Sequence, residues 1–303
     1  MNTIRADRLV VTARRASRVV DRHLAQKVAF GIFWIAGIVT VGVLLLVIGY
    51  VMLQGLRMVN WEFLTTAPRG GLSGEGGMST TIVATLYLVG VTLAIAAPLG
   101  IGSAIFFVEY AGEADDRSGI VKRLVGIARF GVETLAGVPS IVFGLFGYAL
   151  FVTTLRFGFS LLSAGLAGAC LIMPVVIRTT EEALKVVPRS YREGSLALGA
   201  TRWQTIWNVV LPAVLPGIIT GIVLSVGRVV SETAVFYVTL GGSHHMPTSL
   251  MSSGRSMALH VYYLAMETRA FDKAMGTAAV LIVIIVLINW AINLLSCRLC
   301  PPE

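Results

Sequence analysis

Long runs without a charged residue alternate with short charged segments along most of the chain. Each run is close to or above the roughly 20 residues that an α-helix needs to cross the hydrocarbon of a bilayer. The runs lie at residues 28–53, 78–108, 134–155, 157–177, 209–227 and 274–297. Because lipid cannot satisfy the backbone groups of open strands, the pattern predicts an all-α integral membrane protein with six transmembrane helices.

Composition and charge agree with this prediction. Of the 303 residues, 56% are hydrophobic and only 13% are charged, far from the balance of an average soluble domain. Seventeen of the 24 Lys and Arg residues fall in the segments that are inside when the N-terminus is inside, and six fall outside. The positive-inside rule therefore predicts that both termini are cytoplasmic. The net charge of +8 indicates orientation and attraction to anionic lipid, and we expect no nucleic-acid partner.

The pattern also predicts a simple domain organisation. Residues 1–27 are basic and favour a cytoplasmic tail that lies as a helix on the inner membrane surface. Residues 28–303 are expected to form a single transmembrane domain. A cleaved signal peptide is a poor explanation of the N-terminal region, because the first uncharged run of 26 residues is longer than the apolar part of such peptides.

The polar positions predict three connections between the spans. Arg156 and Gly158 leave room only for a tight hairpin between the third and fourth spans. Residues 254–271, "GRSMALHVYYLAMETRAF", predict a short amphipathic helix at the membrane interface. Arg129 and Glu133, four residues apart, are expected to pair at the inner membrane boundary.

A third connection, "SYREGSLALGATRWQTIWNVVLP" (residues 190–212), is unusually structured. Ser190 and Glu193 form the S-x-x-E pattern of a capping box, which predicts the start of a helix. Gly199 has the position of a left-handed helix end. Thr201 and Gln204 repeat the capping pattern, so we predict two short helices with a sharp corner between them, the second running into the fifth span. A plain turn between spans would not require these signals.

One basic residue, Arg228, interrupts the fifth apolar segment, directly after the uncharged run of residues 209–227. A charge within a span costs about 2.5 to 3.5 kcal/mol on insertion scales, so the side chain is expected to face a polar pathway or a partner. Helical spacing predicts one polar face made of Gly221, Ser225, Arg228 and Glu232. A guanidinium suits a tetrahedral oxyanion, with Glu232 holding it in place between passages. A purely structural ion pair between Arg228 and Glu232 is the alternative.

The structured connection resembles the EAA motif of ABC importer membrane subunits. Glu193 and Gly199 match its E and G, and Leu211 and Pro212 match its final L-P after the expected spacing, while Gly194 and Ser195 replace the two alanines. The resemblance implies a type I importer permease fold and a coupling helix that docks into a separate ATP-binding subunit. The residues that it assigns to this contact are Glu193, Gly194, Ser195, Leu196, Gly199 and Ala200.

Three flanking segments carry a narrower resemblance. Residues 133–152, 183–205 and 227–242 are similar to phosphate-specific ABC importer permeases, more to the A-type than to the C-type subunit. The likeness extends over about residues 78–297. It implies a transport subunit for inorganic phosphate in a bacterial or archaeal inner membrane. The implied partners are a C-type permease, an ATP-binding subunit dimer and an extracytoplasmic phosphate-binding protein.

We expect no cofactor, metal site or catalytic residue in this chain, with ATP and Mg bound by the partner ATPase. The sequence holds no G-x-x-x-x-G-K-[ST] motif, so the chain is not expected to hydrolyse ATP itself. Other functions remain alternatives. A permease for sulfate or molybdate fits the same residues, an intramembrane protease rests on Ser73 within "GLSG", and an autonomous carrier leaves the structured connection unexplained. The pair Cys297 and Cys300 has no assigned role.

Overall fold

A computed structural model describes residues 3–69, 75–111 and 119–299, with side chains for residues 24–69, 75–111 and 123–294. Every regular element in these ranges is helical. Five helices in the described ranges are long and apolar enough to cross a membrane, and a bent helix pair passes the same test when it is counted as one span. The predicted all-α fold is therefore confirmed, and five of the six predicted spans are single helices. Contacts group the chain into two units, Met1–Leu53 and Gln54–Glu303, while the predicted boundary at residue 28 stays a prediction.

The first unit is one helix, α1 (Thr3–Gly55). Its apolar part corresponds to the first predicted span. None of the described side chains between residues 24 and 53 is buried by the chain itself. An apolar helix of this length with exposed side chains is stable only where lipid or another subunit covers it.

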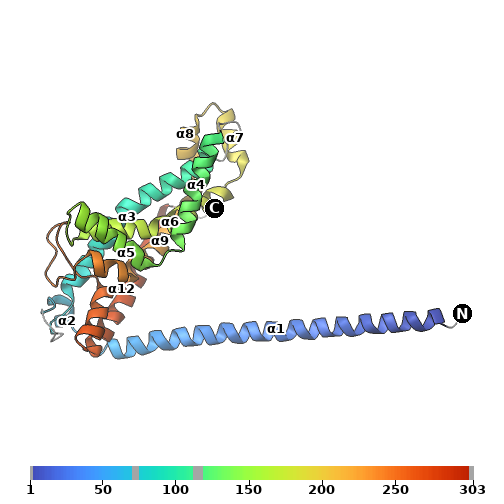
Figure 1. The fold of residues 1–303 in the computed structure, drawn as a ribbon, viewed down its shortest axis with the longest axis horizontal. Coiled ribbons are helices and arrows are strands. Elements are labelled where there is room, and N and C mark those ends of the chain that lie inside the picture. Colours follow the sequence, from blue (N-terminus) through green and yellow to red (C-terminus); the bar gives the residue numbers. More distant parts are fainter. Residues whose placement is uncertain (1–2, 70–74, 112–118, 300–303) are drawn as a thin grey trace. The chain divides into compact units, whose positions relative to one another are not determined.

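Three long helices form the centre of the second unit (Figure 1). They are α3 (Ser79–Ile105), α6 (Leu161–Val186) and α9 (Leu211–Ser231). α6 is the most buried of the spans and packs against both of the others. Its N-terminal half carries the small residues of "LLSAGLAGAC", which let neighbouring helices approach closely in lipid. A Cβ atom on Gly165 would lie only 2.5 Å from a methyl group of Val91 on α3, so the contact depends on glycine.

The third predicted span, residues 134–155, is wrong as a single helix. The chain instead forms α4 (Gly119–Ala136) and then α5 (Ser140–Gly147), which continues as the π-helical η3 (Tyr148–Thr154). The two parts are bent by 109°. Pro139 explains the break, because its ring removes a backbone donor and disfavours a helical conformation for the residue before it. Side chains of α4 therefore pack beside α6 rather than forming only a connection.

The hairpin after η3 is confirmed. Arg156 and Gly158 have φ angles of 56° and 65°, which turn the chain directly into α6. Glycine adopts this left-handed conformation without steric cost, whereas Arg156 adopts it at a cost that the short connection imposes.

Several shorter helices pack at the same end of the unit. They are α2 (Trp61–Thr65), α10 (Ala234–Thr239), α11 (Met257–Tyr262) and η5 (Tyr263–Glu267), followed by the last span, α12 (Phe271–Leu299). The helix predicted within residues 254–271 is present, and its position at the membrane interface stays a prediction. Met257 and Leu259 are fully buried, because α11 packs against α12 and α3. We call the end of the second unit that these short helices form the hairpin end.

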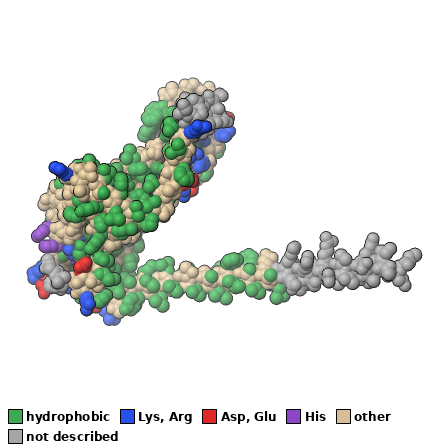
Figure 2. Space-filling view, in the orientation of Figure 1, with side chains coloured by type: hydrophobic (Ala, Val, Ile, Leu, Met, Phe, Trp, Pro, Cys, Tyr) green, Lys and Arg blue, Asp and Glu red, His purple; other side chains and the backbone are tan. Residues whose placement is uncertain are grey.

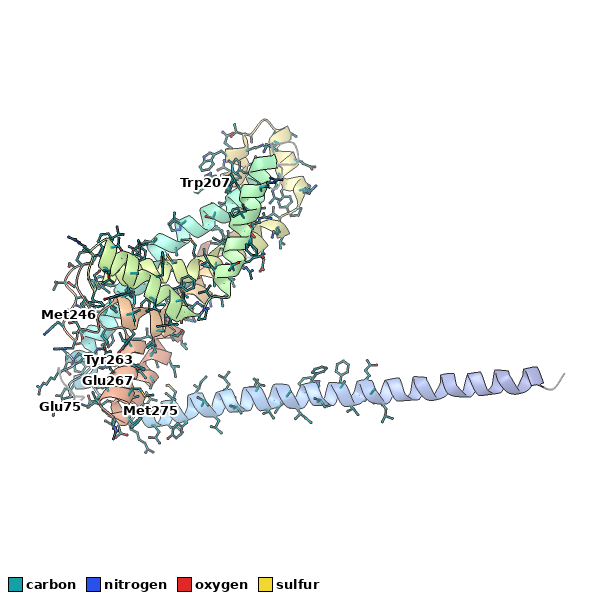
Figure 3. All side chains as sticks on the ribbon, in the orientation of Figure 1. Glu75, Trp207, Met246, Tyr263, Glu267 and Met275 are labelled. Atoms are coloured by element: carbon teal, nitrogen blue, oxygen red, sulfur yellow. The ribbon has the colours of Figure 1, made fainter. Side chains whose placement is uncertain are left out.

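Hydrophobic and charged side chains are distributed differently over the second unit. Hydrophobic side chains cover the middle of the second unit, and charged side chains gather toward its two ends (Figure 2). Trp207 lies near one end, whereas Glu75, Tyr263 and Glu267 lie near the other (Figure 3).

Glycine substitution tests the close packing of these helices. A Cβ on Gly144 of α5 would lie 2.8 Å from a methyl group of Val238 and 3.0 Å from the backbone of Val235. Gly144→Leu should therefore destabilise the protein by about 1 to 3 kcal/mol, measured as a lower midpoint of thermal unfolding in detergent. Gly90→Leu is the matched control, since nothing lies within 4 Å of a Cβ there. Equal unfolding midpoints for the two variants would contradict this packing.

Candidate functional site

The connection between α6 and α9 forms a corner of two short helices, which we call the elbow (residues 188–205). α7 (Arg189–Ala197) is followed by Gly199 with a φ of 86° and then by α8 (Arg202–Thr205). The left-handed glycine and the two-helix corner are therefore confirmed. α8 continues through the π-helical η4 (Ile206–Val210) into α9, also as predicted.

The second capping box is confirmed and the first is wrong. Thr201 accepts a hydrogen bond from the backbone N–H of Gln204, and Gln204 accepts one of 2.8 Å from the backbone of Thr201. α7, however, begins directly after Pro188, which is its N-cap and offers no side-chain bond. Ser190 is consequently the second helical residue and does not have the extended backbone of a capping residue. Glu193 is exposed on the surface of α7.

A hydrogen bond fixes the angle of the elbow. The hydroxyl groups of Ser195 on α7 and Thr205 on α8 lie 2.9 Å apart. The backbone N–H of Ala200 donates to the carbonyl of Ser195, and that of Gly199 donates to Leu196. The two helices are thus tied across the corner and move as one body.

Arg192 anchors the elbow to the membrane helices. Its Nε donates to both carboxylate oxygens of Glu109, at 3.1 and 3.0 Å, and its Nη2 donates to one of them at 2.7 Å. Glu109 lies in η1 (Phe106–Tyr110), the π-helical end of α3. The guanidinium also donates to two carbonyls at the end of α6, those of Leu184 at 2.9 Å and Val187 at 2.7 Å.

This contact is largely shielded from water. The side chains of Arg192 and Glu109 are 19% and 11% exposed. A partly buried, bidentate pair of this kind is held by charge-assisted hydrogen bonds and is costly to break from one side. The sequence predicts no specific contact for Arg192, which entered only the count of basic residues. No local pattern connects it to Glu109, 83 positions earlier, so sequence reasoning missed the anchor.

The outer surface of the elbow is open. A Cβ on Gly194 or Gly199 would meet nothing within 4 Å. Leu198 is 91% exposed, and Tyr191 and Leu196 are exposed beside it. A projecting apolar corner with glycines on its surface has the form of a contact for another protein.

The polar face predicted on α9 is divided by the structure. Gly221 and Ser225 are buried, and a Cβ on Gly221 would clash with Thr179 of α6. Arg228 is exposed, although it follows Gly221 by seven residues and lies on nearly the same stripe of α9. The α6 contact thus covers Gly221 and Ser225 but not Arg228, and their shared role in a pathway stays a prediction.

Glu232 lies beyond the end of α9. The helix ends at Ser231, and Glu232 has an extended backbone whose carboxylate accepts hydrogen bonds from the backbone N–H groups of Ala234 and Val235. Within the part of the chain that the structure describes, no hydrogen bond or ion pair joins Glu232 to Arg228. Glu232 instead stabilises the start of α10.

The predicted pair of Arg129 and Glu133 is also wrong. Arg129 lies 3.6 Å from a carboxylate oxygen of Glu181 on α6 and donates to the carbonyl of Phe107 at 2.7 Å. The bend after α4 brings Arg129 beside these two helices, where a buried carbonyl and carboxylate compete better than an exposed neighbour one turn away.

Among the described residues, no group of three or more His, Cys, Asp and Glu side chains is arranged to hold a metal ion. Ser73 and Cys300 lie outside the described residues, and the side chain of Cys297 does too.

Comparisons with known proteins give this geometry its context. Residues 98–299 match the family described as binding-protein-dependent transport system inner membrane component. The phosphate transport system permease protein PstA 1 of Mycobacterium tuberculosis (strain ATCC 25618 / H37Rv) is 34% identical over 89% of this chain and 87% of its own. PstA of Mycobacterium leprae (strain TN) is 32% identical over 99% of both chains. PstC of Haemophilus influenzae is 27% identical over 68% of this chain and 70% of its own.

Solved structures share the fold. A chain of a bacterial alginate ABC transporter, in complex with a pentasaccharide-bound periplasmic protein, has a TM-score of 0.64 and 15% identity, over 88% of this chain and 95% of that one. A chain of the MetNI methionine ABC transporter, in inward-facing conformations, has a TM-score of 0.56 and 18% identity, over 73% and 97%. The predicted importer permease fold is confirmed.

Loosening the anchor should release the elbow. Arg192→Lys keeps the charge but loses the planar fork that reaches Glu109 and the two carbonyls together, and Glu109→Gln removes the negative partner. Since leaving one member of a buried pair alone costs about 3 to 5 kcal/mol, we expect amide hydrogen exchange in α7 to accelerate about tenfold or more. Arg189→Lys, an exposed change on the same helix, is the control and should leave exchange unchanged. Unaltered exchange in both anchor variants would show that Arg192 does not hold the elbow.

Proposed function

The chain belongs to the binding-protein-dependent transport system inner membrane components, among the PstA phosphate permeases, and we propose that it forms half of the pathway of an ATP-driven importer of inorganic phosphate. It is a transport subunit that spans the membrane several times. The observation that carries the proposal is the elbow, a rigid two-helix corner with an open outer surface and a buried anchor to the membrane helices.

The elbow receives force from a separate ATP-binding subunit. Its exposed face from Glu193 to Ala200 docks into that subunit, with Gly194 and Gly199 allowing close approach. Movement then passes along two routes. One is the continuous helical path from α8 through η4 into α9, and the other is the Arg192 contact with the ends of α3 and α6. ATP and Mg are held by the partner, consistent with the missing P-loop motif.

Arg228 meets the cargo. An exposed guanidinium in the last turn of an apolar span is costly in lipid, so we infer that it lines a polar pathway shared with a second permease subunit. Guanidinium binds tetrahedral oxyanions through paired hydrogen bonds. The capping role of Glu232 leaves Arg228 to contact the anion, since no hydrogen bond or ion pair joins the two among the described residues. Gly221 and Ser225 support the pathway from behind, by packing α9 against α6.

The complete transporter contains this chain, a C-type permease related to the PstC that matches it, an ATP-binding subunit dimer and an extracytoplasmic phosphate-binding protein. The elbow and both termini face the cytoplasm, following the excess of basic residues in those segments. The apolar surface of α1 is covered by lipid or by the second permease.

The other functions are less well supported. A permease for sulfate or molybdate would use the same Arg228, but the PstA relatives match the chain along almost all of its length. An autonomous carrier has no use for the anchored elbow. An intramembrane protease would need Ser73, whereas Ser73→Ala should leave phosphate uptake by a transporter unchanged.

Blocking the elbow surface should separate the permease from its ATPase. Gly199→Arg puts a long side chain on the open corner at a φ that only glycine adopts readily. We expect loss of co-purification of the ATP-binding subunit, measured by affinity purification from membranes. Gly158→Arg is the matched control, because Gly158 also has a positive φ and open space but lies in the hairpin turn. Normal co-purification of Gly199→Arg would argue against docking at this corner.

Removing the guanidinium should stop transport without disturbing assembly. Arg228→Ala is expected to abolish labelled phosphate uptake while the complex still purifies intact, because the side chain is exposed. Arg123→Ala removes an exposed cation from α4 and serves as the control. Uptake by Arg228→Ala at the control rate would exclude Arg228 from the mechanism.

A further inference from the structure

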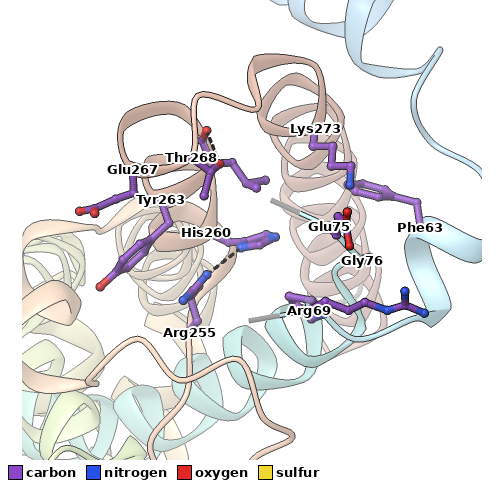
Figure 4. Close-up of a pocket in the computed structure, with 12 residues that line it drawn as sticks. Phe63, Arg69, Glu75, Gly76, Arg255, His260, Tyr263, Glu267, Thr268 and Lys273 are labelled. Carbon is purple, nitrogen blue, oxygen red and sulfur yellow. Dashed lines mark hydrogen bonds between the residues drawn. The ribbon is translucent and has the colours of Figure 1, made fainter. Parts of the chain in front are cut away.

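A second charged site lies at the hairpin end, away from the elbow (Figure 3). It is a cavity of about 150 Å³, well above the roughly 30 Å³ that one water occupies in the liquid. Its walls come from α2, from the base of the glycine-rich loop, from α11 and η5, and from the start of α12. Segments far apart in sequence thus converge on it (Figure 4).

Arg255 is fixed at one wall of this cavity. Its Nε donates to the carbonyl of Gly242 at 2.9 Å, and its guanidinium lies 4.2 Å from the ring centre of Tyr263. Its Nη1 lies 3.5 Å from Nδ1 of His260. The guanidinium is held by three different partners, so it is ordered before any ligand arrives.

His260 supplies an uncharged donor beside it. The side chain is 3% exposed, and burial, with the positive charges of Arg255 and Lys273, lowers the pKa of His260 to about 3. The ring is therefore neutral at physiological pH. Because arginine can only donate, Nδ1 of His260 is the acceptor and the ring proton is on Nε2. The ring extends from α11 toward Glu75 and Lys273 (Figure 4).

The remaining charges make the cavity positive while keeping an acceptor in it. The lining side chains include three cations, Arg69, Arg255 and Lys273, and two carboxylates, Glu75 and Glu267. Glu267 points away from His260, whereas Glu75 lies beside Lys273 (Figure 4). Cationic donors attract any oxyanion. A carboxylate beside them can form a hydrogen bond with a protonated oxyanion, whereas a fully deprotonated oxyanion offers it no donor.

We propose that this cavity is a receiving site for inorganic phosphate, or another hydroxyl-bearing tetrahedral oxyanion, before the anion enters the membrane pathway. Arg255, Lys273 and Arg69 attract the anion, and His260 Nε2–H donates to it. Glu75 accepts a hydrogen bond from the hydroxyl group of the anion. It disfavours sulfate, which carries no proton at neutral pH. The proposal rests on the phosphate transport function for the identity of the cargo.

The base of the loop holds two of these residues in place. Pro68 and Gly76 form an antiparallel bridge, and the backbone N–H of Arg69 donates to the carbonyl of Glu75 at 2.9 Å. A Cβ on Gly76 would lie 2.5 Å from backbone atoms, and its φ is 88°. A glycine at this position thus permits the close approach of residues 67–69 to residues 75–76, which brings the backbones of Arg69 and Glu75 side by side.

The test measures equilibrium binding of radiolabelled inorganic phosphate to the assembled transporter, without ATP and without the extracytoplasmic binding protein. An Arg228→Ala background removes binding at the membrane pathway. We expect Lys273→Gln and Arg69→Gln each to weaken phosphate binding about tenfold or more, the usual effect of losing a charged hydrogen bond. Arg57→Gln, an exposed cation between α1 and α2 that does not line the cavity, should bind phosphate as the parent does.

A change of selectivity guards against variants that merely misfold. Arsenate should displace labelled phosphate from the parent, and sulfate should not, whereas Glu75→Gln should let sulfate compete. Phosphate binding equal to that of Arg57→Gln in both cation variants would overturn the site, as would equal competition by sulfate and arsenate in the parent. The proposed transport function fails separately, if the complex with Arg228 intact takes up no phosphate with ATP and the binding protein.

Discussion

The guanidinium of Arg192 is the point at which the elbow and the membrane helices become one structure. Its donors reach the carboxylate at the end of α3 and two carbonyls at the end of α6, so three helices depend on a single side chain. α3 and α6 share the most extensive packing of the second unit. A displacement of α7 cannot occur without moving these helix ends or breaking a shielded ion pair, and the second outcome is costly. The elbow is therefore mechanically connected to the centre of the bundle.

The remainder of the molecule is arranged along that connection. α9 leads from the elbow toward Arg228, and its buried face packs closely on α6 at Gly221. Farther along the same helix the guanidinium is exposed, where a second subunit would complete a pathway. The end opposite the elbow carries the charged cavity around Arg255. Force, pathway and entry of the anion thus fall on separate parts of one helical unit, which matches the proposed cycle of an ATP-driven importer.

Local signals in the sequence predicted what local physics determines. Six apolar runs are sufficient to predict six spans, and Gly199 and the Thr201 capping box are determined by neighbours within four residues. The Ser190 box failed because Pro188 already begins the helix, a competition that the S-x-x-E pattern does not reveal. The contacts of Arg192 with Glu109 and of Arg129 with Glu181 depend on helix packing between distant segments. The pattern of buried and exposed residues on α9 likewise depends on its packing against α6, which the periodicity of α9 alone does not reveal.

The account is tested most directly by labelled phosphate uptake into vesicles that contain the purified transporter with this chain. ATP is supplied or omitted on the side of the membrane that carries the ATPase. The phosphate-loaded binding protein is supplied or omitted independently on the opposite side. The account predicts accumulation only when both are present, because the elbow must be driven by the ATPase and the anion must be delivered from the other side. Uptake at the same rate without ATP would contradict it and would identify the chain as a carrier that works alone.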